Sequence, residues 1–391
     1  MNIIVECNKS ASVFVCGDIL NMVNNGLICS SELSKIISSA DYSVCNFEAP
    51  VEGFGSSAIK PGVNLAQKQG TIEVLKRQGF NLLLLANNHM MDFGSQALDA
   101  TLKIAEKNII ETIGAGLEAK VVYRPLIKTI NGLKIGMLNA CEAQFGEIED
   151  IEKDGEPGYA WINHSVIERN IIKCKKECDF VIVFSHAGLE HYPIPQKEWR
   201  EKYRHFCKLG ADIIIGSHPH VPQGFERYGE SWIFYSLGNF YFEINSSVTR
   251  ENNSFAVILN LIKGKEVDFK LIHHYTKNNR VELAPPEKEI DIAKLNSFLG
   301  VDYLAEHDKM IMEEYRKLKK LMAISVFLPV PFNGSFKSFI HMFLSNIMKR
   351  GQVRFKDLFI LHLLKNETYH YVIKNGLEII MKRKYNKKIL K

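Results

Sequence analysis

Short apolar runs that end in polar residues alternate with amphipathic segments between residue 11 and about residue 280. The runs close at Asp18, Glu48, His89, Ala140, His186 and His218. Each run has the length of a strand, whereas Ser95–Lys107 and Gln196–Leu209 repeat apolar residues at helical spacing. Strands that alternate with helices pair in parallel through crossover connections. The pattern therefore predicts a layered α/β fold.

One of these runs, N-L-L-L-L-A-N-N-H-M-M-D-F-G, extends from Asn81 to Gly94. Four leucines indicate a strand buried on both faces, and two amides, an imidazole and a carboxylate follow it. In open α/β sheets, ligands bind in the crevice at the carboxyl ends of the strands. This stretch is therefore either part of a site or, more simply, a turn with a helix cap.

The character of the chain changes at A-P-P-E-K, residues 284–288. Before it, Ser254–Ile262 and Val267–His274 are expected to form antiparallel strands. After it, long helical patterns predominate, so we predict a domain of residues 1–285 and a basic, mostly helical extension of residues 286–391. The extension has an apolar stripe at helical spacing, made of Phe336, Phe339, Ile340, Phe343, Leu344 and Ile347. Such a face either packs on its own protein or, beside nearby lysines and arginines, lies in a membrane interface.

Composition and charge narrow the function classes. With 46% hydrophobic and 24% charged residues, the chain of 391 residues is neither disordered nor fibrous. It shows no secretory signal and no uninterrupted apolar run of about 18 residues, so we expect it in the cytoplasm. The eight cysteines lack the paired spacing of a zinc or disulfide framework.

The charge is concentrated near the C-terminus, where residues 341–391 contain 12 Lys and Arg but 3 Asp and Glu. This segment is either a solvated helical face or a contact for anionic lipid or another polyanion. Nucleic acid is not the expected partner, because no nucleic-acid-binding motif accompanies the basic residues.

The polar groups at the strand ends form one chemical set. They are Asp18, Glu48, Asn88, His89, Asp92, His186, His218 and His220. Carboxylates, imidazoles and an amide oxygen are ligands for a divalent metal such as Mn²⁺, Zn²⁺ or Fe²⁺. In an extended His218-Pro219-His220 segment, both imidazoles would share one face and reach one cluster. Two ions bridged by a carboxylate could clamp a phosphoryl group.

Six ordered motifs carry a family resemblance: G-D-I-L, N-F-E-A-P-V, A-N-N-H-M-M-D-F-G, H-A-G-L-E, G-A-D-I-I-I-G-S-H-P-H-V-P-Q and Y-S-L-G-N-F. Together they resemble the CapA family of bacterial capsule or poly-γ-glutamate synthesis proteins. The domain of that family is similar to the calcineurin-like metallophosphoesterases. The resemblance covers residues 11–245 and implies a four-layer α/β/β/α fold with one or two divalent ions between its sheets.

The resemblance also implies a role for each side chain. Asp18 and His220 would bind the first metal, and Glu48 would bridge both ions. The second metal would be bound by Asn88, His186 and His218. His89 would act as the general acid, held by Asp92. Glu190 and Asn239, which lie in the H-A-G-L-E and Y-S-L-G-N-F motifs, are expected to bind substrate.

Two departures from the family pattern bear on function. Leu20 stands where wider metallophosphoesterases carry a histidine ligand, so we expect one tight and one weaker metal site. Ala187 replaces a tryptophan of many relatives in the wall that faces the substrate. The favoured hypothesis is a metal-dependent phosphohydrolase acting on a phosphorylated or polyanionic envelope-polymer intermediate. The alternative is a non-catalytic, metal-dependent accessory protein that binds such a polymer or intermediate in the same pathway.

Overall fold

The computed structural model describes residues 9–23, 26, 28–153, 155–243, 253–327 and 355–389. The chain divides into two compact units. One consists of Met1–Ala58 with Asn64–Gly300, and the other of Ile59–Val63 with Val301–Lys391. The domain boundary expected at residue 285 stays a prediction.

The first sheet of the larger unit combines parallel and antiparallel strands in the order β17-β16-β15-β1-β2-β3-β4, and β14 also pairs with β1. Its strands are β1 (Ser10–Asn21), β2 (Tyr42–Phe47), β3 (Leu82–Leu84), β4 (Glu111–Ile113), β14 (Asn239–Glu243), β15 (Asn253–Ile262), β16 (Asp268–Lys277) and β17 (Arg280–Leu283). Strands β1 to β4 are parallel. Strands β15 and β16 form the antiparallel pair that the sequence predicted.

The second sheet has the order β12-β13-β11-β10-β7-β6. Its strands are β6 (Leu126–Ile130), β7 (Leu133–Cys141), β10 (Phe180–His186), β11 (Ile213–Ser217), β12 (Phe225–Tyr228) and β13 (Ser231–Phe234). The inner strands are parallel, and the edge strands β6 and β12 are antiparallel to their neighbours. A small third sheet joins β5 (Ala115–Gly116), β9 (Gly158–Ala160) and β8 (Glu147–Ile148).

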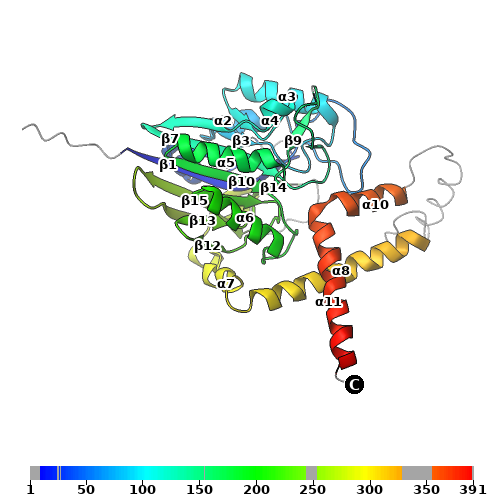
Figure 1. Ribbon diagram of the computed structural model, residues 1–391. Helices are drawn as coiled ribbons and strands as arrows, with labels where there is room; N and C mark the ends of the chain where they lie inside the picture. The colour runs from blue at the N-terminus through cyan, green and yellow to red at the C-terminus, as the bar shows by residue number, and fades with distance from the viewer. Residues whose placement is uncertain are drawn as a thin grey trace, which may run out of the picture. The chain divides into compact units, whose positions relative to one another are not determined.

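Side-chain alternation along the strands explains how the layers stack. Val13 and Val15 of β1 pack in one core cluster with Phe184 of β10, which places the two sheets face to face. Phe14, between the two valines, points the other way and packs with Leu33 and Leu98 of the helices on that side. The larger unit is thus an α/β/β/α sandwich (Figure 1), as predicted.

The larger unit contains helices that cover the outer faces of both sheets and one short helix, Ile292–Ser297, whose Leu295 belongs to the core cluster between the sheets. They are α1 (Ser31–Ser39), α2 (Thr71–Arg77), α3 (Gly94–Lys107), α4 (Ala119–Val122), α5 (Ser165–Glu177), α6 (Lys197–Leu209) and α7 (Ile292–Ser297), with a 3₁₀ turn at Pro286–Lys288. Helix α6 packs on the second sheet, where the hydroxyl of Tyr203 lies 2.7 Å from that of Ser185 in β10. Residues 95–107 and 196–209 were predicted as helices, and α3 and α6 match them within one residue.

The smaller unit is helical, with α8 (Tyr303–Phe327), α10 (Phe355–Lys365) and α11 (Glu367–Ile389). Helices α8 and α11 approach closely at Gly376, where an added Cβ would lie 2.5 Å from the ring of Tyr315. The predicted apolar stripe at residues 336–347 lies outside the described residues. Among the helices that the structure describes, none combines the length and apolarity needed to span a bilayer.

Candidate metal and catalytic site

The predicted ligands meet where the carboxyl ends of strands from both sheets face each other. Asp18 belongs to β1, Glu48 directly follows β2, His186 ends β10 and His218 directly follows β11. All four are buried. Parallel strands deliver their carboxyl ends to one edge of a sheet, and packing two sheets face to face brings two such edges together.

Asn88, His186 and His218 form a group with a common centre. The Oδ1 atom of Asn88 lies 3.1 Å from Nε2 of His186, and this nitrogen lies 3.1 Å from Nδ1 of His218. Glu48 Oε1 is 3.9 Å from the same Nε2 atom. Ligand atoms about 2 Å from one ion are spaced about this far apart, so the four side chains could hold one metal together. This is the set that the resemblance assigns to the second ion.

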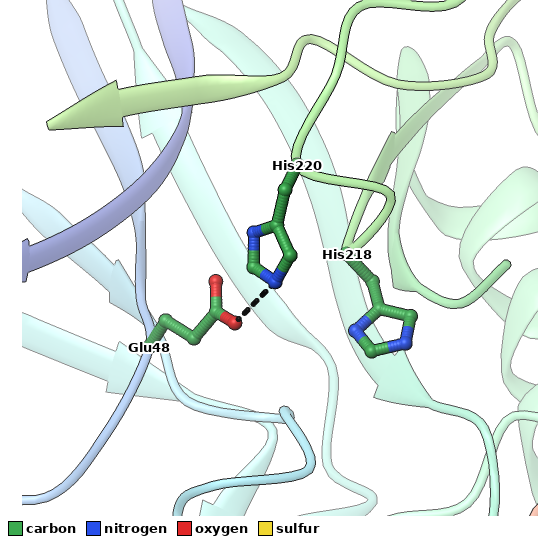
Figure 2. Close-up of side chains that lie close together, drawn as sticks. All are labelled: Glu48, His218 and His220. Atoms are coloured by element: carbon green, nitrogen blue, oxygen red, sulfur yellow. Dashed lines mark ion pairs between the residues drawn. The ribbon is translucent and has the colours of Figure 1, made fainter. Parts of the chain in front are cut away.

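Asp18 and His220 lie on the other side of Glu48. The Nε2 atom of His220 is 3.4 Å from Glu48 Oε1, and its Nδ1 atom is 3.3 Å from Oδ2 of Asp18. Figure 2 shows Glu48 and His220 pointing toward each other, with His218 beside them. Glu48, His218 and His220, and likewise Asp18, Glu48 and His186, bring ligand atoms within 4.8 Å of one another. Glu48 is therefore placed to contact two ions.

The His218-Pro219-His220 segment reaches this cluster by a route that differs from the predicted one. We expected an extended segment, but His218 has φ of 93° and His220 has φ of 58°. Such positive φ values are strained for residues with a Cβ and concentrate at functional sites. The two imidazoles still converge, with ring centroids 5.9 Å apart, because the turn rather than a pleat directs them.

A close backbone approach fixes Asp18 beside Asn239. Strand β14 runs parallel to β1, with Asp18 opposite Asn239, and the amide of Asp18 donates to the carbonyl of Gly238. A Cβ on Gly17 would lie 1.8 Å from that carbonyl oxygen. The G-D motif thus carries glycine because a side chain at Gly17 would prevent this approach, whereas Gly238 adopts a positive φ of 73° that favours glycine.

The Glu48 carboxylate shows that the site fits a cation. It is fully buried, and within the described residues neither of its oxygens accepts a hydrogen bond. Burial and the nearby Asp18 carboxylate raise the pKa of Glu48 well above its usual value. Buried carboxylate oxygens without donors are costly unless a positive charge compensates them. A divalent ion would supply that charge, and the surrounding ligand types suit one.

The histidines differ in charge. Burial lowers the pKa of His218 to about 4, and burial with the neighbouring imidazoles lowers that of His186 well below its usual value. Burial alone would also lower the pKa of His220, but Glu48 and Asp18 outweigh it and raise that pKa to about 10. His186 and His218 are therefore neutral, as metal ligands must be, and a metal would have to replace the proton on His220.

Neighbouring polar groups orient two of these imidazoles. Nδ1 of His186 lies 3.0 Å from the hydroxyl of Ser217, which donates onward to the carbonyl of Ser185. Nδ1 of His220 lies 2.9 Å from Oδ1 of Asn239. An oxygen acceptor at Nδ1 leaves Nε2 free as the ligand nitrogen in both rings. Asn239 thus contacts a predicted ligand, and its expected substrate contact stays a prediction.

His89 and Asp92 form a pair at the edge of the cluster. Nδ1 of His89 lies 2.6 Å from Oδ2 of Asp92, an oxygen that also accepts from the amide of Leu65. Asp92 is buried, whereas 13% of the His89 side chain is exposed. His89 directly follows Asn88, which belongs to the group around His186. Nδ1 is thus the ring nitrogen that contacts Asp92, and Nε2 lies on the opposite edge of the ring.

The structure adds Asn46, Glu142 and Gln144, which were not among the predicted residues. Asn46 Nδ2 donates to Asp18 Oδ1 at 2.8 Å. Glu142 follows β7 and is fully buried, with its Oε1 atom 3.6 Å from Nε2 of His218. Gln144 receives a hydrogen bond from Asn88. The signal for Glu142 was present, because it is the polar end of the strand that was predicted to close at Ala140.

Glu190 and Leu20 complete the surroundings. Glu190 is 41% exposed, and its Oε1 atom lies 3.9 Å from Nε2 of His218, so it stands at the rim. Its predicted substrate contact stays a prediction. Leu20 is fully buried in a small cluster with Ala49 and Leu65. The position at which a histidine ligand for the first metal would be expected is therefore filled by a packed leucine.

Comparison with known proteins gives one family. Residues 22–244 match the model of the family described as bacterial capsule synthesis protein PGA_cap. The capsule biosynthesis protein CapA of Bacillus anthracis is 32% identical over 228 residues, which cover 56% of this chain and 55% of that protein. The PGA biosynthesis protein CapA of Bacillus subtilis is 33% identical over 223 residues, covering 56% and 58%.

The chain therefore spans little more than half the length of these relatives. Among solved structures, a hypothetical protein from Thermus thermophilus is 14% identical with a TM-score of 0.42. The alignment covers 67% of this chain and 99% of that one.

Proposed function

The chain belongs to the bacterial capsule synthesis protein family PGA_cap, and on this premise we propose that it is a metal-dependent phosphoester hydrolase of capsule or poly-γ-glutamate synthesis. Membership confirms the family resemblance predicted from the sequence. The observation that supports an enzyme is the His89–Asp92 pair beside a buried set of metal ligands. A site that only holds a polyanion has no need of a positioned acid.

The metal would be held by two groups of side chains that share Glu48. Asn88, His186 and His218 would bind one ion, and Asp18 and His220 would bind the other. Bound divalent ions supply an activated water and stabilise negative charge on a phosphoryl group. The proposed ion is Mn²⁺, Zn²⁺ or Fe²⁺, because carboxylate, amide and imidazole ligands suit all three.

The residues of the chain itself perform the proton transfer. Asp92 would accept from Nδ1 of His89 and hold the ring in one orientation, which leaves proton transfer to Nε2. A protonated Nε2 can then give its proton to the leaving alkoxide as the phosphoester bond breaks. Burial of Asp92 keeps water away from this contact and holds the imidazole in one orientation.

The proposed substrate is a phosphorylated intermediate or an anionic polymer of the cell envelope. The family description and the names of both CapA relatives support this pathway. Screening the metal-loaded protein against phosphomonoesters and phosphodiesters tests the activity. We expect the protein to hydrolyse at least one of these phosphoesters, and we expect hydrolysis to require both the metal and His89.

A specific observation favours a second function, that of an accessory protein which binds an anionic polymer without hydrolysing it. Leu20 packs against Ala49 and Leu65, which leaves the first metal with fewer ligands than in wider metallophosphoesterases. A weakly held first ion would leave the site able to bind anions but poor at catalysis. Metal-loaded protein that retains an anionic polymer and hydrolyses no phosphoester would favour this function.

Peripheral contact with an anionic membrane is proposed for the C-terminal region. In the described part of α11, Leu377, Met381 and Tyr385 recur every four residues and are 48%, 66% and 68% exposed. Lys374 and Lys384 lie on the same helix and are also exposed. An apolar stripe beside lysines suits the interface of a bilayer that contains anionic lipid.

A further inference from the structure

Glu142 is a buried carboxylate at the site that the proposed metal ligands do not include. Its Oε2 atom accepts from the amide of Gly188 at 3.3 Å, and its Oε1 atom accepts from Nε2 of Gln144 at 2.6 Å. These bonds fix the carboxylate between the end of β7 and the loop that follows β10. The same Oε1 atom lies 3.6 Å from Nε2 of His218.

Two tautomers of His218 are compatible with its neighbours. If Nδ1 carried the proton, Nε2 could accept from Gln144 Nε2, which is 3.3 Å away. Nδ1 would then direct a proton toward Nε2 of His186, at 3.1 Å, and could not bind an ion. If Nε2 carried the proton, it would face the Glu142 carboxylate, and Gln144 would donate to Glu142 and not to the ring. Nδ1 would then present a lone pair to the centre shared with Asn88 and His186.

We propose that Glu142 is a positioning residue that accepts the Nε2 proton of His218 and thereby directs Nδ1 toward the metal. The inference rests on the proposed metal site. Metal-bound histidines commonly donate their other ring proton to a carboxylate, which fixes the tautomer and raises the basicity of the ligand. The separation of 3.6 Å is longer than a formed hydrogen bond, and we expect it to shorten when the ion binds.

Burial distinguishes Glu142 from the other groups around Nε2. Glu190 also lies near this atom, at 3.9 Å, but 41% of its side chain is exposed, whereas both oxygens of Glu142 accept hydrogen bonds inside the protein. Gln144 already donates to Glu142 and carries no charge. Glu142 is fully buried, and a negative charge there interacts strongly with an imidazole that shares positive charge with an ion.

The variant Glu142→Gln tests this role through metal binding. It removes the charge and nearly preserves the volume, so we expect the affinity of the tighter ion to fall about 10–100-fold, as for other residues that orient a metal ligand. Titration with Mn²⁺ against a competing chelator measures the affinity. Glu147→Gln is the control, because Glu147 lies five residues further along the chain, at the start of β8, and its Oε2 atom lies 3.5 Å from the hydroxyl of Tyr159.

The melting temperature of the metal-free protein separates positioning from a structural role. We expect Glu142→Gln to lower the metal-free melting temperature only slightly, because loss of the buried charge offsets the one hydrogen bond, from Gly188 or Gln144, that the amide can no longer accept. Equal metal affinities of Glu142→Gln and wild type would overturn this inference alone, and so would a large fall in the metal-free melting temperature. A wild type that binds no ion would overturn the proposed function as well.

A second measurement uses only the wild-type chain. Histidine labelled with ¹⁵N, in the Zn²⁺-loaded protein, reports which ring nitrogen of His218 carries the proton. We expect the proton on Nε2. A proton on Nδ1 would contradict the inference whatever the variant shows.

Discussion

The amide oxygen of Asn88 lies 3.1 Å from Nε2 of His186, although the two residues are 98 positions apart and lie at the ends of strands from different sheets. Neither polar group faces solvent, since both side chains are buried. The contact indicates that the two sheets enclose a polar centre at their carboxyl ends.

Replacing Asn88 by alanine should lower the metal content without unfolding the chain. The wild type, reconstituted with Mn²⁺, should hold at least one ion per chain, and Asn88→Ala should bind it more than about 10-fold more weakly because a ligand is lost. Elemental analysis and chelator competition measure both. Asn260→Ala, which removes an exposed amide contact to Asp268, is the control. Less than a tenth of an equivalent of metal in the reconstituted wild type would contradict the metal site.

Leu20→His should strengthen the weaker metal site. In the metal-free protein the change should cost about 2–4 kcal/mol, because it removes a packed leucine and buries an imidazole. Mn²⁺ should restore more stability to Leu20→His than to wild type, since a ligand has been added. Leu20→Ala leaves the same packing defect without a ligand. Equal gains from Mn²⁺ in the histidine and alanine variants would argue against a first metal beside Leu20.

The Glu226 carboxylate should make folding stability depend on acid. Hydrogen bonds from Arg200, Arg204 and Tyr235 converge on it at 2.6–2.8 Å. Burial alone would raise the pKa of Glu226, but these donors outweigh it and lower that pKa to about 2. A lowered carboxyl pKa stabilises the fold above the unfolded value, near 4.5, and the stabilisation is lost as pH falls from there to about 2.

Glu226→Gln should therefore destabilise the fold by about 1–3 kcal/mol at pH 7, after allowance for partial solvent screening. The difference from wild type should shrink as the pH falls below about 4.5. Urea unfolding at a series of pH values measures it. Glu266→Gln, which breaks an exposed pair with Arg227, should change stability by less than about 0.5 kcal/mol. A constant difference across the acid range would show that Glu226 acts without its charge.

If α11 of the smaller unit contacts the membrane, changing the charge of its exposed face should weaken binding to anionic vesicles. Met381→Glu combined with Lys384→Glu should weaken sedimentation of the full chain with vesicles that contain anionic lipid by at least about 10-fold. Lys173→Glu with Lys176→Glu, on the exposed side of α5, should leave it unchanged. If both double variants sediment like wild type, α11 does not bind the membrane.

The sequence predicted the strand ends because burial constrains them strongly. Buried runs such as Leu82–Leu84 exclude polar residues, so Asn88 and His89 were conspicuous. Asn46 was not predicted as a site residue because it lies within β2, where it interrupts the apolar run without ending it. Its function depends on the contact with Asp18 in the neighbouring strand.

The pattern of apolar and polar residues did not predict the long-range strand pairing or the backbone strain. The parallel pairing of β14 with β1 joins Asp18 and Asn239, which are far apart in the chain, and local periodicity carries no trace of it. The positive φ of His218 and His220 was missed because the expected extended conformation already explained their convergence. Strain of this kind is imposed by the surrounding fold rather than by the local sequence.

The central claim is that the site catalyses hydrolysis through His89. His89→Asn should keep the metal content near wild type, because this ring is outside the ligand set, and should lower phosphoesterase turnover about 10²–10⁴-fold, since an amide cannot protonate the leaving alkoxide. The decisive measurement is the turnover of one screened phosphoester by fully metal-loaded wild type and His89→Asn. Loss of turnover at equal metal content is the predicted result. Equal turnover by the two proteins, or none by the loaded wild type, would contradict the claim and leave the accessory-binding function.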